Sequence, residues 1–299
     1  GGEKTRNRNA ADARPRPAQH AAWRISCPPL TLAPMLFFLT SQPLWISGAI
    51  IIGGGTLLAM LGPALVRRYV ALDRLTINNE IAGFKFATVD VLYAVLLAFV
   101  IIVVWEKFSD AEANVVREAG AAENLYRLSQ GLGDFSGADL RKSVAGYLKA
   151  AMADDWPAMD KGTVHAGGAA KQALDAIYRM LSVVNDQRNR AIVAEIFSQL
   201  DRITEARRSR LIAAEGAVPD VIWLVLLGGA VVTIAFTFFF GMESLRAQTV
   251  MTALLAVLIF SELLVVIVID RPFTGSVKVP PTALADVLAD VESQPDEPR

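Results

Sequence analysis

The sequence predicts an all-α membrane protein with four transmembrane helices and a helical-bundle insert between the second and the third. Two observations lead to this prediction. The chain of 299 residues is 53% hydrophobic and only 20% charged, which is more apolar than a soluble domain of this size. It also contains four almost uncharged stretches of the length, about 20 residues, that crosses a hydrocarbon layer of roughly 30 Å as a helix.

Lipid offers no hydrogen-bond partner to an unpaired backbone amide, so each of these stretches is expected to be helical. The first and third contain no charged residue, the second contains only Asp90, and the fourth contains only Glu262. The predicted transmembrane helices are Leu44–Val66, Phe86–Trp105, Val221–Phe240 and Val250–Ile269.

The insert between the second and third spans is predicted to be helical as well. Apolar residues recur at intervals of three and four from Phe108 to Leu128, without a helix breaker. The second span is therefore expected to continue out of the membrane as one long helix. Further apolar stripes occupy residues 140–151, 174–184 and 192–211, which indicates a bundle of helices.

The two ends of the chain have a different composition from the spans and the insert. Residues 1–34 are polar, rich in Arg and Pro, and expected to be disordered, and Met35 is a plausible natural start of translation. The tail, residues 271–299, is rich in proline and expected to be irregular. Between them we predict a first transmembrane pair (35–105), the insert (106–217) and a second transmembrane pair (218–270).

Composition excludes several classes of function. A net charge of −1, from 29 basic and 30 acidic residues, lacks the positive surface that nucleic-acid binding requires. One cysteine, Cys27, and two histidines, His20 and His165, offer no disulfide and too few ligands for a zinc site. The sequence contains no recognisable nucleophile or nucleotide motif. We therefore predict no metal, no cofactor, no nucleic-acid partner and no enzymatic activity.

Glu262 is the strongest functional candidate, because an ionisable side chain within the hydrocarbon is energetically costly. It lies about 18 Å from the short-loop end of its span at 1.5 Å per residue, close to mid-membrane. No Lys, Arg or His of the other spans lies at that depth. Two interpretations stay open: a protonated, hydrogen-bonded Glu262 among closely packed helices, or a hydrated ion path.

Small residues lie level with Glu262 in all three other spans, Ala98 being the one in the second span. They are predicted either to let helices pack closely or to line a cavity that hydrates the carboxylate. These helix-packing candidates are Gly53, Gly54, Gly55, Gly228 and Gly229.

Three further polar residues complete the set of pore-lining candidates. Asp90 lies near the short-loop end of the second span, where it either snorkels to the interface or supplies a charge at a pore mouth. It shares a helix face with Ala94 and Ala98. Thr233 and Thr237 share a face of the third span.

Charged residues of the insert have simpler interpretations. The adjacent Asp154 and Asp155, followed by Pro157, are interpreted as turn residues that end a helix. A group of arginines before the third span is interpreted as a solvated helix face or an anchor to anionic headgroups. Its members are Arg202, Arg207, Arg208 and Arg210.

Several strings together identify a family. In order along the chain, these strings are Asn78–Phe86, Glu106–Tyr126, Ala213–Gly216, Phe236–Gly241 and Asp270–Gly275. With them the sequence resembles the bestrophin-like domain family of bacterial membrane proteins over about Met35–Leu284.

The family name implies a relation to bestrophins, which are pentameric, mainly anion-conducting channels. Bestrophins have four spanning helices, a helical cytoplasmic insert and cytoplasmic ends, and Pro272–Phe273 is similar to the Pro-Phe pair that follows their last span. This sequence departs from them in two respects. The Val89–Val104 face of the second span is aliphatic apart from Tyr93 and Phe99, unlike their aromatic hydrophobic neck, and no acidic calcium clasp follows Phe273. Calcium gating is therefore not carried over.

Four spans place the insert and both ends of the chain on one side of the membrane. Basic residues in the short loops favour the cytoplasm for those loops, whereas the resemblance favours a cytoplasmic insert, which we adopt. The short-loop basic residues are Arg67, Arg68, Arg74, Lys85 and Arg246.

The function predicted from the sequence is a homo-oligomeric ion channel or pore in the bacterial inner membrane. Because its intramembrane charges are acidic, cations or protons are the expected ions. The alternative is a non-conducting membrane scaffold or sensor whose helical insert binds a partner.

Overall fold

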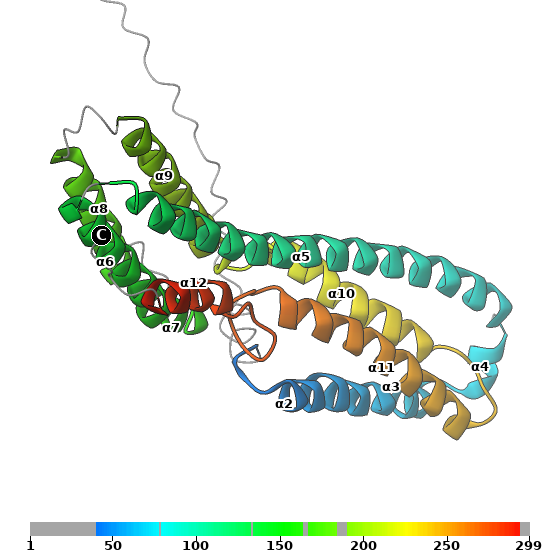
Figure 1. Ribbon diagram of the computed structural model, residues 1–299. Coiled ribbons are helices and arrows are strands. Elements are labelled where there is room, and N and C mark those ends of the chain that lie inside the picture. Colours follow the sequence, from blue (N-terminus) through cyan, green and yellow to red (C-terminus); the bar gives the residue numbers. More distant parts are fainter. Residues whose placement is uncertain (1–39, 78, 133, 164–166, 184–189, 294–299) are drawn as a thin grey trace, which may run out of the picture.

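A computed structural model describes residues 40–77, 79–132, 134–163, 167–183 and 190–293 of the chain, and across these ranges the regular structure is entirely helical. Within these ranges, four helical segments are long and apolar enough to span a membrane. They lie side by side in one half of an elongated molecule, and the insert forms the other half (Figure 1). The predicted fold class is confirmed.

The four spans lie close to the predicted positions. The first consists of α2 (Leu44–Gly48), a π-helical segment η1 (Ala49–Gly54) and α3 (Gly55–Tyr69), and α4 (Leu72–Thr76) follows it. The second is the first part of α5 (Asn79–Ser129), which runs the length of the molecule (Figure 1). The third is α10 (Asp220–Thr237) and the fourth is α11 (Leu245–Ile269).

Side chains at the short-loop end of the spans explain where α10 ends and where α11 begins. The Gln248 amide Nε2 donates to the carbonyl of Phe240 at 2.7 Å and to that of Phe238 at 3.2 Å. It thus satisfies carbonyls that the end of α10 leaves without a helical partner. As a result α10 ends three residues earlier than predicted. Helix α11 begins five residues earlier, where the Ser244 hydroxyl accepts the N–H of Ala247 at 3.4 Å.

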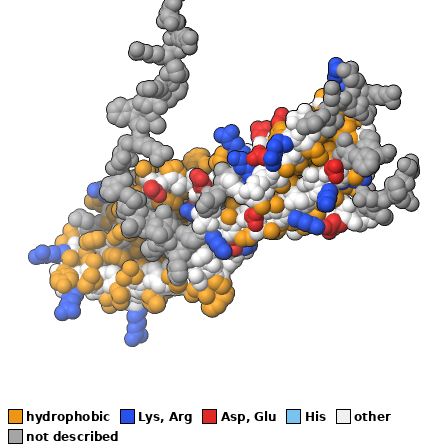
Figure 2. Space-filling model, turned by 90° about the vertical axis from the view of Figure 1, so that its left-hand side faces the viewer, with side chains coloured by type: hydrophobic (Ala, Val, Ile, Leu, Met, Phe, Trp, Pro, Cys, Tyr) orange, Lys and Arg blue, Asp and Glu red, His pale blue; other side chains and the backbone are white. Residues whose placement is uncertain are grey.

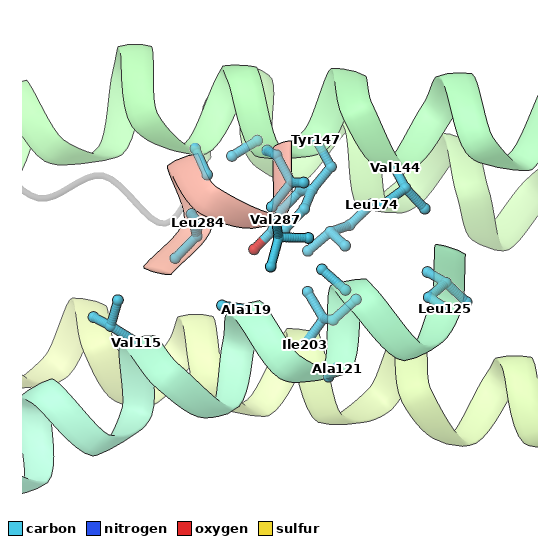
Figure 3. Packing of buried hydrophobic residues seen from close by; sticks show 14 of the residues in the cluster. Val115, Ala119, Ala121, Leu125, Val144, Tyr147, Leu174, Ile203, Leu284 and Val287 are labelled. Atoms are coloured by element: carbon cyan, nitrogen blue, oxygen red, sulfur yellow. The ribbon is translucent and has the colours of Figure 1, made fainter. Parts of the chain in front are cut away.

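The insert is a bundle around one apolar core. After α5 leaves the membrane, the chain forms α6 (Asp134–Ala150), η2 (Ala151–Asp155), α7 (Trp156–Asp160), α8 (Ala169–Val183) and α9 (Arg190–Ala213). Helices α5 and α9 pack along each other, and side chains from α5, α6, α8 and α9 meet between them (Figure 3). The apolar stripes expected from the sequence supply this core, including Val115, Leu125, Val144, Leu174 and Ile203.

The helix expected to end at Asp154–Pro157 continues instead to Asp160. Residues 151–155 form a π-helical turn, and Pro157 stands in the first turn of α7. A proline lacks an N–H and is tolerated there, because the first turn of a helix makes no use of that donor. The wider π turn thus lets the chain continue past a proline that would otherwise end the helix.

The tail was expected to be irregular, and this is wrong for residues 282–293. They form α12 (Thr282–Ser293), which packs on α5 and α6. Leu284 is 0% and Val287 8% exposed, and both join the core of the insert (Figure 3). The prolines at 280 and 281 precede the helix, where they do not interrupt it. The expected disorder of residues 1–34 and the start at Met35 concern residues outside the described ranges.

The surface, like the fold, has two parts that differ in the type of side chain they expose. Hydrophobic side chains gather over one half of the molecule, whereas acidic and basic side chains cluster over the other (Figure 2). Exposed apolar residues of the spans include Leu57 and Leu58 of α3 and Leu92 and Phe99 of α5. Such a surface needs lipid or another protein chain to cover it.

Truncation of Leu284 tests whether α12 is part of the insert. We expect Leu284→Ala to lower the stability of the insert by about 2 to 5 kcal/mol, because it leaves a cavity in the core. The measurement is thermal unfolding together with hydrogen exchange of the amides of residues 282–293. Asp286→Ala, an exposed position of the same helix, is the control and should change neither. Equal exchange in both variants would contradict the docking of α12.

Candidate functional site

The two intramembrane carboxylates, Glu262 of α11 and Asp90 of α5, lie close enough to interact electrostatically. Glu262 also interacts in this way with the hydroxyl of Tyr93. Tyr93 is buried, and its hydroxyl donates to the carbonyl of Leu226 in α10 at 3.0 Å. The site therefore joins three spans, with both carboxylates partly exposed at the protein surface.

The face of α5 beside this pair consists of small, exposed residues. Ala94 and Ala98, predicted to share a helix face with Asp90, are both exposed in the chain. A small-residue surface next to two carboxylates is suited either to close approach of a second helix or to a water-filled space.

The two threonines of α10 lie elsewhere. Thr233 is 0% exposed, and its hydroxyl has no hydrogen-bond partner among the described residues. The Thr237 hydroxyl donates to the Ile234 carbonyl at 2.6 Å and lies 3.2 Å from that of Thr252 in α11. Both threonines therefore face the interior of the chain rather than its surface.

Only two of the five predicted packing glycines contact another helix closely. A methyl group built on Gly229 would lie 2.5 Å from the ring of Tyr93, and one on Gly55 would lie 2.6 Å from the ring of Phe260. Methyl groups on Gly53, Gly54 and Gly228 would meet no described atom within 4 Å. These three glycines leave room for lipid or a neighbouring chain.

The segment after the fourth span joins the membrane part to the insert. One carboxylate oxygen of Asp270 accepts the N–H groups of Ala217 at 3.0 Å and Val218 at 2.8 Å. Burial raises the pKa of Asp270, although these two hydrogen bonds act in the opposite direction. Phe273 is 1% exposed and meets the ring of Trp156 edge-on at 6.1 Å. The segment Asp270–Gly275, which contributes to the family resemblance, is therefore a structural joint between the membrane part and the insert.

A network of charged side chains connects three elements of the insert. Arg210 of α9 donates from Nε to Oε2 of Glu118 in α5 at 2.7 Å, and from Nη2 to Oε1 at 2.9 Å. Its Nη2 also donates to Oδ2 of Asp155 in η2 at 3.0 Å. Arg207 donates to both oxygens of Asp155, at 2.8 and 3.0 Å. The network therefore contains two cations and two anions, and their charges balance.

This network is closed to solvent. Glu118 and Arg210 are 0% exposed, Asp155 is 4% and Arg207 6%. The Tyr147 hydroxyl adds a hydrogen bond to Oε1 of Glu118 at 2.6 Å. Charges withdrawn from water this completely are tolerated only when they are paired and hydrogen-bonded, which is the arrangement found here.

The electrostatics fix the protonation states of two members. Burial raises the pKa of Tyr147 well above its ordinary value, and the negative charge of Glu118 raises it further. Burial lowers the pKa of Arg210, but the charge and hydrogen bonds of Glu118 outweigh this and raise it overall. Tyr147 is therefore a neutral donor and Arg210 a permanent cation.

The interpretation of Arg207 and Arg210 as a solvated face is wrong, as is that of Asp155 as a turn residue. Arg202 and Arg208 are exposed, as expected, and so is Asp154. The buried members are in phase with the apolar stripes: Arg207 and Arg210 follow Ile203 by four and seven residues. A charged residue at a core position of a helical stripe was the signal that would have identified them.

No group of three His, Cys, Asp or Glu that could hold a metal occurs within the described residues. Cys27, His20 and His165 lie outside them.

Four spans, two intramembrane carboxylates that interact electrostatically and an insert built on buried ion pairs define an integral membrane protein of the all-α class. The chain belongs to the Bestrophin-like domain family, because the family model matches residues 54–284. The resemblance inferred from the sequence is confirmed.

Solved structures share the fold at low sequence identity. A bacterial bestrophin homolog from Klebsiella pneumoniae is 13% identical with a TM-score of 0.62, over 82% of this chain and 99% of that one. A mutant of the same homolog is 12% identical with a TM-score of 0.63, over 81% and 99%. A membrane protein variant is 13% identical with a TM-score of 0.65, over 80% and 97%. No curated protein sequence matches the chain.

Removing Arg210 tests the buried network. We expect Arg210→Met to lower the free energy of unfolding by about 3 to 5 kcal/mol, because Glu118 keeps a buried charge without its cation. Unfolding in denaturant measures this, with Arg208→Met on the exposed face as the control, expected to stay within about 0.5 kcal/mol. Adding Glu118→Met to Arg210→Met should recover part of the loss, and a double variant weaker than the single would contradict the pairing.

The glycines of α10 offer a matched pair of variants. Gly229→Ala should lower stability by about 1 to 3 kcal/mol, because the new methyl group collides with a Tyr93 ring held by its hydrogen bond. Gly228→Ala, one residue away, should have little effect. Thermal unfolding in detergent compares them, and equal midpoints would show that Tyr93 does not pack against Gly229.

Proposed function

We propose that the protein assembles into a homo-oligomeric ring in the bacterial inner membrane and conducts ions along its axis. The observation that carries this proposal is that Asp90 and Glu262 interact electrostatically beside an exposed face of α5 that includes Ala94 and Ala98. Only 17% to 39% of the apolar window of each span is buried inside the chain. Membership of the Bestrophin-like family and the bestrophin fold agree with such an assembly.

The lining would come from α5 and α11. The exposed face of α5 presents Ala94 and Ala98 next to Asp90, and Glu262 of α11 lies beside them. Because four spans of one chain leave no axial space of their own, a pore requires several copies around an axis. The burial of Thr233, and the hydrogen bonds of the half-buried Thr237 within the chain, favour a helix-packing role for them over pore lining.

The charge of this face favours cations or protons. The two ionisable groups within the apolar parts of the spans, Asp90 and Glu262, are both acidic, and the described spans offer no Lys, Arg or His at the depth of Glu262. A carboxylate in the membrane needs water or a counter-ion. A ring of such residues, repeated in every subunit, would attract cations into a hydrated path and repel anions.

We further propose that the insert and the ends of the chain face the cytoplasm. The first described residues and the segment after the fourth span lie together at the insert side, where the Ser276 hydroxyl donates to the Gln42 carbonyl at 3.2 Å. This contact supports their common side, and the cytoplasmic side is proposed because the resemblance to bestrophins implies a cytoplasmic insert.

Neutralising Glu262 tests the function. In proteoliposomes, Glu262→Gln should reduce the preference for cations over anions, seen as a shift of the reversal potential in a salt gradient. Asp90→Asn should act in the same direction. Asp220→Asn, which removes an exposed carboxylate from the first turn of α10, is the control and should leave selectivity unchanged. Unaltered selectivity in both carboxylate variants, with flux retained, would contradict the proposed lining.

The subunit number is measured separately by native mass spectrometry in detergent. A closed ring of several copies, unchanged in Glu262→Gln, is expected. A monomer or dimer that persists across detergents would overturn the pore and favour the scaffold or sensor alternative.

A further inference from the structure

A polar groove lies between α5 and α9 in the insert, away from the intramembrane carboxylates. Its volume is about 470 Å³, within the range of small-molecule sites. The residues that line it include Asn114, Arg117 and Gly120 of α5 and Gln199, Arg202 and Glu205 of α9. Asn114 and Asn124 mark its extent along α5, about 15 Å at 1.5 Å per residue.

The side-chain oxygen of Gln199, at the groove, has no hydrogen-bond donor among the described residues. Its side chain is 4% exposed, and its Oε1 accepts no hydrogen bond from any described residue. The amide nitrogen donates to Oε1 of Glu195 at 2.6 Å, which fixes the orientation of the amide and leaves the oxygen as the free atom. A buried carbonyl oxygen without a donor is energetically unfavourable. The Gln199 oxygen is therefore an acceptor that a donating group bound in the groove would satisfy.

The charged residues of the groove restrict which kind of molecule can carry the donor for the Gln199 oxygen. Arg202, on the same face of α9 as Gln199, makes no ion pair or hydrogen bond with the residues that the structure describes, and Arg117 contacts only the neutral Asn114 among them. A pure cation would be repelled by these two arginines. A pure anion would satisfy them but would offer nothing to the Gln199 oxygen, and it would face Glu205. A molecule that carries both an anionic group and a hydrogen-bond donor would satisfy the arginines, Glu205 and the Gln199 oxygen together.

We infer that this groove binds a small zwitterion of the amino-acid type. Its carboxylate lies against Arg202 or Arg117, and its ammonium group donates to the Gln199 oxygen and pairs with Glu205. Gly120 on the wall leaves the space open, because a methyl group built there would meet no described atom within 4 Å. The inference is independent of ion conduction, since it concerns the insert alone.

Binding is measured by isothermal titration calorimetry on the purified full-length protein in detergent. The probes are L-serine and L-glutamine, with acetate and ethylammonium as their separated halves. We expect an amino acid to bind, and each half to bind at least tenfold more weakly, because each lacks one of two charge-assisted contacts. Equal binding of acetate would reduce the groove to an anion site and overturn the inference.

Two pairs of variants locate the binding. Arg202→Gln should weaken binding at least tenfold, whereas Arg208→Gln, exposed on another face of α9, should not. Gly120→Leu should block the groove without a steric clash, and Gly146→Leu, equally free of neighbours in α6, should bind as the unmodified protein does. Loss of binding in the Arg208 or Gly146 variant, or no heat with any probe, would overturn the inference and leave a water molecule as the partner of Gln199.

Discussion

The constraint on which the insert depends is the pairing of four charges in a space without water. Arg210 reaches Glu118 on one helix and Asp155 on another, and Arg207 completes the second pair. A charge in such a place destabilises the fold unless its partner is present. The elements α5, η2 and α9 can therefore pack in only one register. Apolar side chains alone tolerate small shifts along a helix, whereas two bidentate contacts do not.

The membrane part is held by different means, because lipid removes the hydrophobic drive that assembles the insert. Its contacts are short-range: the Tyr93 ring against Gly229, the Phe260 ring against Gly55, and side chains that satisfy helix ends. Between the two parts lies the joint of Asp270 and Phe273, which binds the backbone before α10 on one side and Trp156 on the other. Asp270–Gly275, one of the strings that carry the family resemblance, thus lies where the packing of the membrane part meets the packing of the insert.

The sequence predicts the spans and the insert because each rests on a local pattern: apolar length in one case, and a three-and-four spacing in the other. What it misses depends on contacts between distant segments. Residues 282–293 become a helix because Leu284 and Val287 find a core to enter. Asp155 is buried because a π turn carries it towards α9. Asp90 and Glu262 were identified singly, but their proximity depends on the register of α5 against α11, which no pattern within either span determines.

Helix α5 has a mechanical consequence for the molecule. It runs for 51 residues without a break, a rod of about 77 Å at 1.5 Å per residue. The membrane half of the rod carries Asp90, and the insert half carries Glu118 and the wall of the groove. A rod of that length that pivots near its middle by about 5° moves each end by about 3 Å, and Asp90, which lies nearer the middle, by less. Because α5 is one continuous helix, a tilt of its insert half would be transmitted to Asp90 inside the membrane.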